Sequence, residues 1–171
     1  MFSHGNSWLY ILLLIFLNTI LIPVLLFYLM KRFGIIDSLQ METRKDRFLP
    51  FLVTGIFYLT TAYVLNQVDV FENLSHVFVF SAILTFIALI VTSFWKISVH
   101  SMAVGAMTGL IIYLTGLQFF DSPWLAYSSI IASGLVGFAR LKLQAHDSTQ
   151  VYGGFLLGVL AFSLTILWLV I

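Results

Sequence analysis

The chain contains no cysteine and very little charge. Only 9% of its 171 residues are charged, against roughly a quarter in an ordinary soluble domain. The absence of cysteine excludes disulfides, thiolate metal sites and a cysteine nucleophile. The net charge of +1 comes from scattered cations rather than from the basic stripe that nucleic-acid binding needs, so no nucleic-acid partner is expected. With 61% hydrophobic residues and a mean hydropathy of +1.06, the composition predicts an integral protein of the lipid bilayer.

Long apolar runs dominate the sequence. A helix needs about 20 mainly apolar residues to cross a hydrocarbon layer of about 30 Å, and six runs meet this need: 8–30, 48–65, 71–95, 100–120, 124–139 and 151–171. The runs show no ten-residue dyad alternation, which is the pattern of a membrane β-barrel. We therefore predict an all-α fold, a polytopic transmembrane helical bundle of about six spans, with residues 1–171 forming a single domain.

The basic residues are distributed unevenly between the two membrane faces. Successive spans reverse direction, so the first, third and fifth connections share one face, and all eight lysines and arginines belong to that face. The excess of lysine and arginine in cytoplasmic loops predicts that this face lies in the cytoplasm. We expect an integral protein of a bacterial inner membrane in this orientation.

Small residues recur every fourth position in two of the spans. Ser101, Gly105 and Gly109 form one row, and Gly154 and Gly158 form another. Four residues make about one helical turn, so each row lies on one helix face and allows close approach of a neighbouring backbone. We expect the fourth and sixth spans to pack closely against their neighbours.

The three connections on the basic face carry cations together with two histidines. Their polar residues are Arg44, Lys45 and Arg47 in the first, Lys96, Ser98 and His100 in the third, and Arg140, Lys142 and His146 in the fifth. Neighbouring cations repel one another unless an anion lies between them, and a phosphate group with several accepting oxygens suits this position. Two histidines can act as nucleophile and proton donor in phosphoryl transfer. The pattern predicts a phosphate-handling site beside the lipid.

Two short motifs resemble those of the type 2 phosphatidic acid phosphatases, membrane relatives of nonspecific acid phosphatases and vanadium haloperoxidases. The segment Ile97-Ser98-Val99-His100 is similar to the family's P-S-G-H motif. Further along the chain, Arg140 is followed after five residues by His146 and after three more by Gln150, close to the family's S-R-x5-H-x3-D pattern, and "VYGGFLLG" follows. The resemblance covers most of the chain from about Arg44 onward.

The resemblance implies a role for each site residue. His146 would be the nucleophile that forms a phosphohistidine, His100 would protonate the leaving alcohol, and Gln150 would take the place of the carboxylate that orients the nucleophile. The phosphate oxygens would be held by Arg140, Ser98 and Lys96. Arg44, Arg47 and Lys45 would stand in for a further motif of the family, K-x6-R-P, since here Arg47 lies three residues before Pro50 rather than next to it. No metal and no cofactor would be required.

Two replacements within these motifs carry expectations of their own. Val99 replaces a glycine, so a turn that needs a positive φ would be strained at this position. Gln150 can still accept a hydrogen bond from the imidazole one helical turn away, but it carries no charge. A nearby carboxylate typically changes a pKa by about 1 to 3 units, so the protonated imidazole would lack that support here.

The predicted function is hydrolysis of a phosphate ester or diphosphate of a lipid, through a phosphohistidine and without metal. The phosphorylated lipid substrate would enter from the bilayer. The alternative is a catalytically inactive protein of the same fold that binds phospholipid or acts as a scaffold. A third interpretation, a small transporter subunit, would call for ionisable residues deep within the spans or for broken helices near the midplane.

Overall fold

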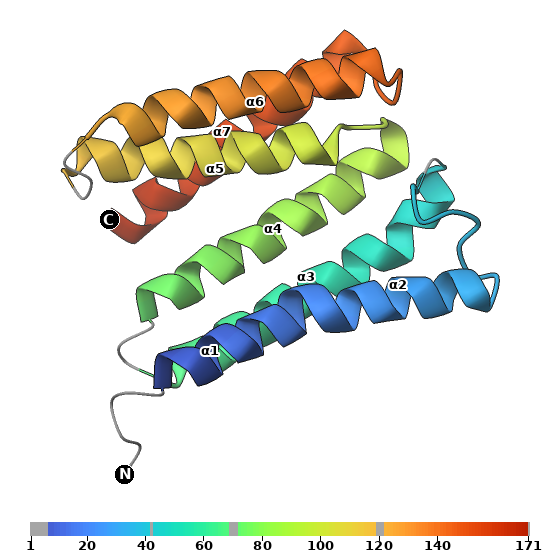
Figure 1. The fold of residues 1–171 in the computed structure, drawn as a ribbon, viewed down its shortest axis with the longest axis horizontal. Helices are drawn as coiled ribbons and strands as arrows, with labels where there is room; N and C mark the ends of the chain where they lie inside the picture. The colour runs from blue at the N-terminus through green and yellow to red at the C-terminus, as the bar shows by residue number, and fades with distance from the viewer. Residues whose placement is uncertain (1–6, 42, 69–71, 119–121, 171) are drawn as a thin grey trace. The chain divides into compact units, whose positions relative to one another are not determined.

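The computed structural model describes residues 7–41, 43–68, 72–118 and 122–170, and all regular structure in these ranges is helical. Side chains are described except at 7, 72–73 and 164–170. The helices are α1 (Ser7–Phe16), the π-helix η1 (Leu17–Leu21), α2 (Ile22–Arg32), α3 (Arg44–Asn66), α4 (Glu72–Phe94), α5 (Val99–Gly116), α6 (Trp124–Lys142) and α7 (Ser148–Val170) (Figure 1). Because α1, η1 and α2 follow one another without a break, they form one continuous rod.

Five of these helical segments are long and apolar enough to cross a membrane. They are Trp8–Arg32, Arg44–Asn66, Leu74–Phe94, Val99–Gly116 and Trp124–Lys142. They correspond to the first five predicted runs, with ends that differ by a few residues. The helical prediction is thus confirmed for these five spans, and an integral membrane protein is supported. The sixth predicted run falls in α7, and positions 71, 119, 120 and 171 of the predicted runs lie outside the described residues.

The chain forms two compact units, Met1–Ser93 and Phe94–Ile171. In the first unit α3 and α4 run in opposite directions. Ser75 near the start of α4 donates a hydrogen bond to the carbonyl of Ala62 near the end of α3, at 2.9 Å, and the ring of Phe78 lies 6.1 Å from that of Tyr58. The first turn of α3 and the last turn of α4 therefore share one end of this unit.

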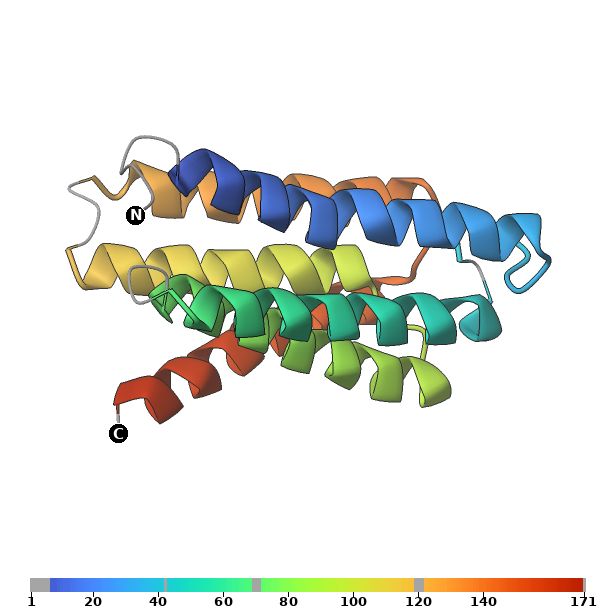
Figure 2. The ribbon, with the colours of Figure 1, turned by 90° about the horizontal axis from the view of Figure 1, so that it is seen from below.

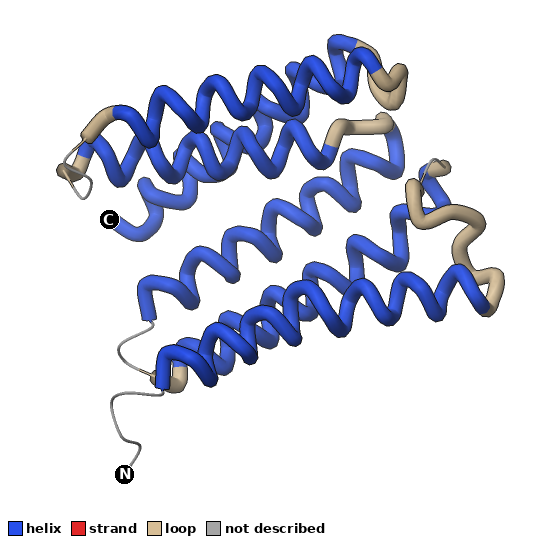
Figure 3. Tube along the Cα trace, viewed as in Figure 1, coloured by secondary structure: helices blue, strands red, loops and turns tan. Residues whose placement is uncertain are grey.

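The link between α2 and α3 is ordered by one buried residue and one cap. Ile36 is 2% exposed, and buried Asp46 accepts the backbone N–H of Asp37 at 2.9 Å. Thr43 caps α3 by accepting from the N–H of Asp46, and its hydroxyl donates to the Asp46 carboxylate at 2.9 Å. These contacts hold the loop (tan in Figure 3) in a defined path into α3.

In the second unit α5 packs against both α6 and α7 (Figure 2). A side chain added at Gly105 would meet the backbone of Phe155, and one added at Gly158 would meet the backbone of Met102. The prediction of close approach at the small-residue rows is thus confirmed, and both rows lie in the contact between α5 and α7. The contact with α6 is more polar, since the hydroxyls of Thr108 and Ser133 lie 2.8 Å apart.

Candidate functional site

The turn between α6 and α7 brings the fifth connection into a compact shape. The chain leaves α6 through Gln144, which has a φ of 52°, and the N–H of Ala145 donates to the carbonyl of Arg140 at 3.2 Å. Asp147 then caps α7, because its Oδ1 accepts from the Gln150 N–H at 2.8 Å and from the Thr149 hydroxyl at 2.6 Å. These hydrogen bonds, the Thr149 hydroxyl first, hold the pKa of the exposed Asp147 carboxyl below its usual value.

The imidazole of His146 is held by Gln150. His146 is 8% exposed, and its Nδ1 lies 2.8 Å from the Gln150 Oε1. An amide oxygen can only accept, so the Nδ1 must carry the hydrogen and the Nε2 of the neutral ring must carry the lone pair. The contact expected between the two side chains is present. However, His146 lies in the turn before α7 and not within the helix, so the turn geometry rather than a helical turn brings the two side chains together.

The start of α5 is attached to the same residue. The N–H of Ser98 donates to the backbone carbonyl of Gln150 at 3.2 Å. Ser98 is fully buried and caps α5, with its Oγ 2.9 Å from the Ser101 Oγ. Ser98, Gln150 and His146 therefore form one connected group at the end of the unit where α5 and α7 begin and α6 ends.

The prediction of backbone strain at Val99 is wrong. Among the described residues, positive φ values occur at Met41, Gln118, Gln144 and Gly34, so Val99 is not in the left-handed region. Ser98 has the extended conformation of an N-cap, with φ −81° and ψ 99°, and Val99 is the first residue of α5. A helix that begins at Val99 needs no positive φ at this residue, so the β-branched side chain of valine is accommodated without backbone strain.

The remaining predicted residues of the second unit differ in environment. Arg140 lies in the last turn of α6, and its Nε is buried with no hydrogen-bond partner among the described residues. His100 is exposed on the first turn of α5, and Lys96 is half-buried in the link before it. Lys142 lies over the ring of Phe138, with its Nζ 5.8 Å from the ring centroid.

The cations predicted from the first connection belong to the first unit. As expected, Arg44 and Arg47 both lie on the first turn of α3, yet their surroundings differ. Arg47 is 7% exposed and its Nε donates to the carbonyl of Met41 at 2.8 Å, whereas Arg44 and Lys45 are exposed. The structure thus links Ser98 and His146 through Gln150, and Arg47 makes a contact of its own near the start of α3.

Asp147 and Ser101 were missed as residues that shape this group. The spacing Asp147-x-x-Gln150 is that of a capping box, which marks the start of a helix, and this signal could have identified Asp147 as the cap. Two helix N-termini, those of α5 and α7, also meet at this end, and each carries partial positive charge. Arg140 adds a full positive charge, while the Asp147 carboxylate that caps α7 and the C-terminus of α6 bring negative charge to the same end.

No protein-family model, curated protein or solved structure matches this chain. Across the described residues, no three histidine, aspartate or glutamate side chains are gathered where they could hold a metal ion.

Proposed function

We propose that this chain is a membrane-bound lipid phosphatase in which His146 is the nucleophile. The observation that carries the proposal is the hydrogen bond of 2.8 Å between His146 Nδ1 and Gln150 Oε1, because it leaves the lone pair on Nε2. The site lies next to the ends of helices long and apolar enough to span a membrane. A phosphorylated lipid can therefore bring its headgroup to this position while its chains stay in the bilayer. The resemblance to the type 2 phosphatidic acid phosphatases supports the same chemistry.

The reaction would proceed in two transfers. His146 Nε2 attacks phosphorus and forms the N–P bond as the P–O bond to the lipid breaks, and the leaving oxygen takes a proton from His100. Water, deprotonated by His100, then attacks the phosphohistidine and releases phosphate, which restores His146. The guanidinium of Arg140, whose Nε lacks a partner among the described residues, would stabilise charge on the phosphate oxygens, helped by the N-termini of α5 and α7.

The alternative is an inactive protein of the same fold that binds phospholipid. It is favoured by Gln150, whose neutral side chain stabilises a protonated or phosphorylated imidazole less than a carboxylate would. It is also favoured by Ser98, whose hydroxyl is buried and engaged in capping α5. A phosphatase releases phosphate from the lipid, whereas the inactive protein only binds it. An assay of phosphate release therefore distinguishes the two functions.

The decisive experiment measures phosphate released from a panel of phosphorylated lipids by the purified protein with EDTA present. A panel containing a phosphatidate, a prenyl diphosphate and a lipid A phosphate covers both esters and diphosphates. We expect release of phosphate that EDTA does not diminish and that vanadate blocks, because the nucleophile is an imidazole and not a metal-bound water. Loss of activity on chelation, with recovery in magnesium, would contradict the mechanism.

The matched variants for this assay are His146→Ala and Lys142→Ala. His146→Ala removes the nucleophile and should abolish release. Lys142 lies in the same connection but faces the exposed ring of Phe138, so its removal should leave release within about twofold, as for a surface change of about 0.5 kcal/mol or less. Binding of phospholipid without any turnover in the unmodified protein would instead establish the inactive alternative.

A further inference from the structure

A polar residue interrupts the apolar first span at mid-depth. Asn18 is the eleventh residue of the segment Trp8–Arg32, which places it about 15 Å from Trp8 at 1.5 Å per residue. That is half of a hydrocarbon layer of about 30 Å. Polar groups at this depth are costly and are usually functional, and this span has little protein around it, since no residue of η1 and only Pro23 of α2 is buried.

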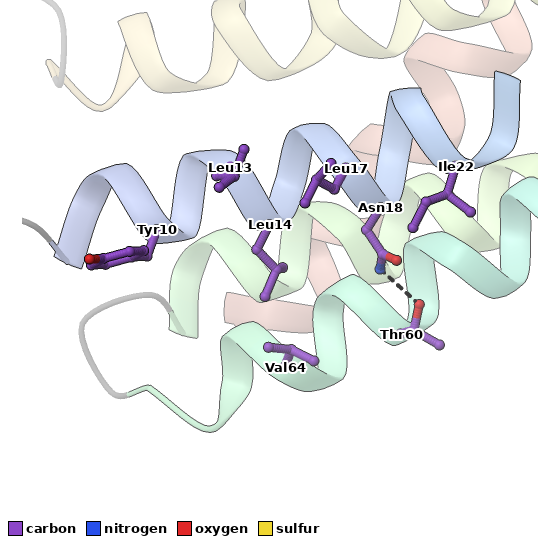
Figure 4. A pocket seen from close by; sticks show the side chains of 8 residues that line it. All are labelled: Tyr10, Leu13, Leu14, Leu17, Asn18, Ile22, Thr60 and Val64. Carbon is purple, nitrogen blue, oxygen red and sulfur yellow. Dashed lines mark hydrogen bonds between the residues drawn. The ribbon is translucent and has the colours of Figure 1, made fainter. Parts of the chain in front are cut away.

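The helix changes its winding at this residue. Asn18 lies in the π-helix Leu17–Leu21, and a π segment inserts one extra residue into the turn. The shift brings Ile22 onto the same face as Tyr10, Leu14 and Asn18, and together with side chains of α3 this face lines a groove of about 460 Å³. Figure 4 shows the groove between the first span and α3. Its lining residues are Tyr10, Leu13, Leu14, Leu17, Asn18, Ile22, Thr60 and Val64.

Asn18, Thr60 and Thr61 form a hydrogen-bonded cluster beside the groove in which every side-chain donor is in use. Asn18 Nδ2 donates to the hydroxyls of Thr60 and Thr61 at 3.0 and 2.8 Å (the first is dashed in Figure 4). Both threonine hydroxyls in turn donate to the carbonyl of Phe57, at 2.9 and 2.8 Å. The Asn18 Oδ1, by contrast, accepts no hydrogen bond from any described residue, and it is not a buried atom. The cluster therefore offers an acceptor to its surroundings and no donor.

The dimensions of the groove limit what can occupy it. Tyr10 and Ile22 are twelve residues apart, about 18 Å along a helix. A helix of that length and about 10 Å in diameter occupies on the order of 1,400 Å³, about three times the groove's volume of about 460 Å³. One extended hydrocarbon chain is therefore a closer match in size than a whole helix.

We propose that the groove binds a single lipid chain that carries a hydroxyl group, with the hydroxyl donating to Asn18 Oδ1. The apolar side chains on either side of Asn18 enclose the methylene groups, and the amide oxygen selects for the hydroxyl. A second copy of this chain is a poor partner for the same site because a whole helix exceeds the volume of the groove. This chain-binding role is separate from the proposed phosphatase chemistry and does not depend on it.

The test compares two fatty acids that differ by one hydroxyl. Deuterated 12-hydroxystearic acid and stearic acid are offered to the full-length protein in phosphatidylcholine nanodiscs, and retained acid is measured by mass spectrometry against empty nanodiscs. We expect the hydroxylated acid to bind roughly three- to tenfold more tightly, the range given by hydrogen bonds within membranes. Equal affinity for both acids would overturn the role of Asn18.

Three variants separate the parts of the proposal. Asn18→Leu should remove the discrimination while the groove still holds a chain. Leu14→Trp fills the groove but keeps the Asn18 hydrogen bonds, and it should abolish retention of both acids. The control Leu12→Trp lies on the same span but outside the groove and is exposed, so it should change nothing. Unchanged retention in Leu14→Trp would refute the groove as the site, as would a stable dimer that depends on Leu14 and Asn18.

Discussion

Gln150 determines how the proposed nucleophile is used. Its Oε1 holds His146 Nδ1 at 2.8 Å, and its backbone carbonyl accepts from Ser98. One residue therefore orients the imidazole and attaches the start of α5 to the start of α7. Because the amide is neutral, it fixes the tautomer of the ring without stabilising a positive charge on it.

Replacement of Gln150 by aspartate should raise turnover several-fold. A carboxylate at this position stabilises the protonated and phosphorylated imidazole, since a neighbouring charge is typically worth about 1 to 3 pKa units. The measurement is phosphate release from the preferred lipid, combined with a titration of His146 by NMR, in which its pKa should rise.

The control for that variant is Gln67→Asp, which makes the same change of side chain at an exposed position just beyond the end of α3, away from the site. It should leave turnover nearly unchanged. If Gln150→Asp and His146→Ala both leave phosphate release unaltered in a folded, monodisperse preparation, the hydrolase proposal fails and the phospholipid-binding alternative is the better account.

At the scale of the element, the start of α7 should depend on pH through Asp147. The pKa of this carboxyl is held below its usual value of 3.8, first by the Thr149 hydroxyl and then by the Gln150 N–H. A lowered pKa in the folded state means that the cap stabilises α7 fully above the unfolded value and is lost as the pH falls through the folded value. Hydrogen exchange at the Gln150 amide should show protection near neutral pH that declines below about pH 4.

Asp147→Asn provides the matched comparison for this prediction. Asparagine also caps helices well but does not titrate in this range. Protection of the Gln150 amide, corrected for intrinsic exchange rates, should then be independent of pH. A decline of equal size in the variant would show that another group is responsible.

The contact between α5 and α7 should tolerate no added side chain. A methyl group at Gly158 would meet backbone atoms of Met102 and Ala106, which cannot move aside as a flexible side chain can. Gly158→Ala should therefore destabilise the protein by about 1 to 3 kcal/mol, as overpacking does. The measurement is the midpoint of unfolding in a denaturing detergent titration.

Gly134→Ala is the control for that effect. Gly134 lies within α6, and nothing is found within 4 Å of an added Cβ. Alanine is favoured over glycine within a helix by about 1 kcal/mol, so this variant should be neutral or slightly more stable. Equal losses in both variants would mean that the close approach at Gly158 is unimportant.

At the scale of the whole molecule, the orientation in the membrane follows from the basic residues. Three of the eight, Lys31, Arg32 and Lys142, are not among the residues that the resemblance assigns to phosphate binding, and they still lie on the same predicted face. We propose that this face is cytoplasmic. A single cysteine at Ser38 should escape an impermeant thiol reagent in intact cells and react after permeabilisation.

A second cysteine variant makes the orientation test internal. Gln67 is exposed just beyond the end of α3, at the opposite end of that span from the loop of Ser38. Cysteine at Gln67 should react in intact cells. The reverse labelling of the two positions would place the histidine site outside the cytoplasm and overturn the charge argument.

The sequence by itself determined the helical spans and one of their packing contacts. In hydrocarbon every backbone polar group must be satisfied within its own segment, so long apolar runs must be helices whatever surrounds them. Close packing at Gly105 and Gly158 was predictable for a similar reason, because small residues repeated at one turn leave room for a neighbouring backbone.

Only the tertiary structure decided which polar groups meet. Ser98 donates to Gln150 and Asn18 donates to Thr60 and Thr61, and these contacts join segments that are far apart in sequence. The helical conformation of Val99 depends on how α5 begins. No periodicity encodes these contacts, because each depends on a helix approaching within hydrogen-bond distance of another. Local burial rules fix the elements, while the polar contacts between them are set by packing in three dimensions.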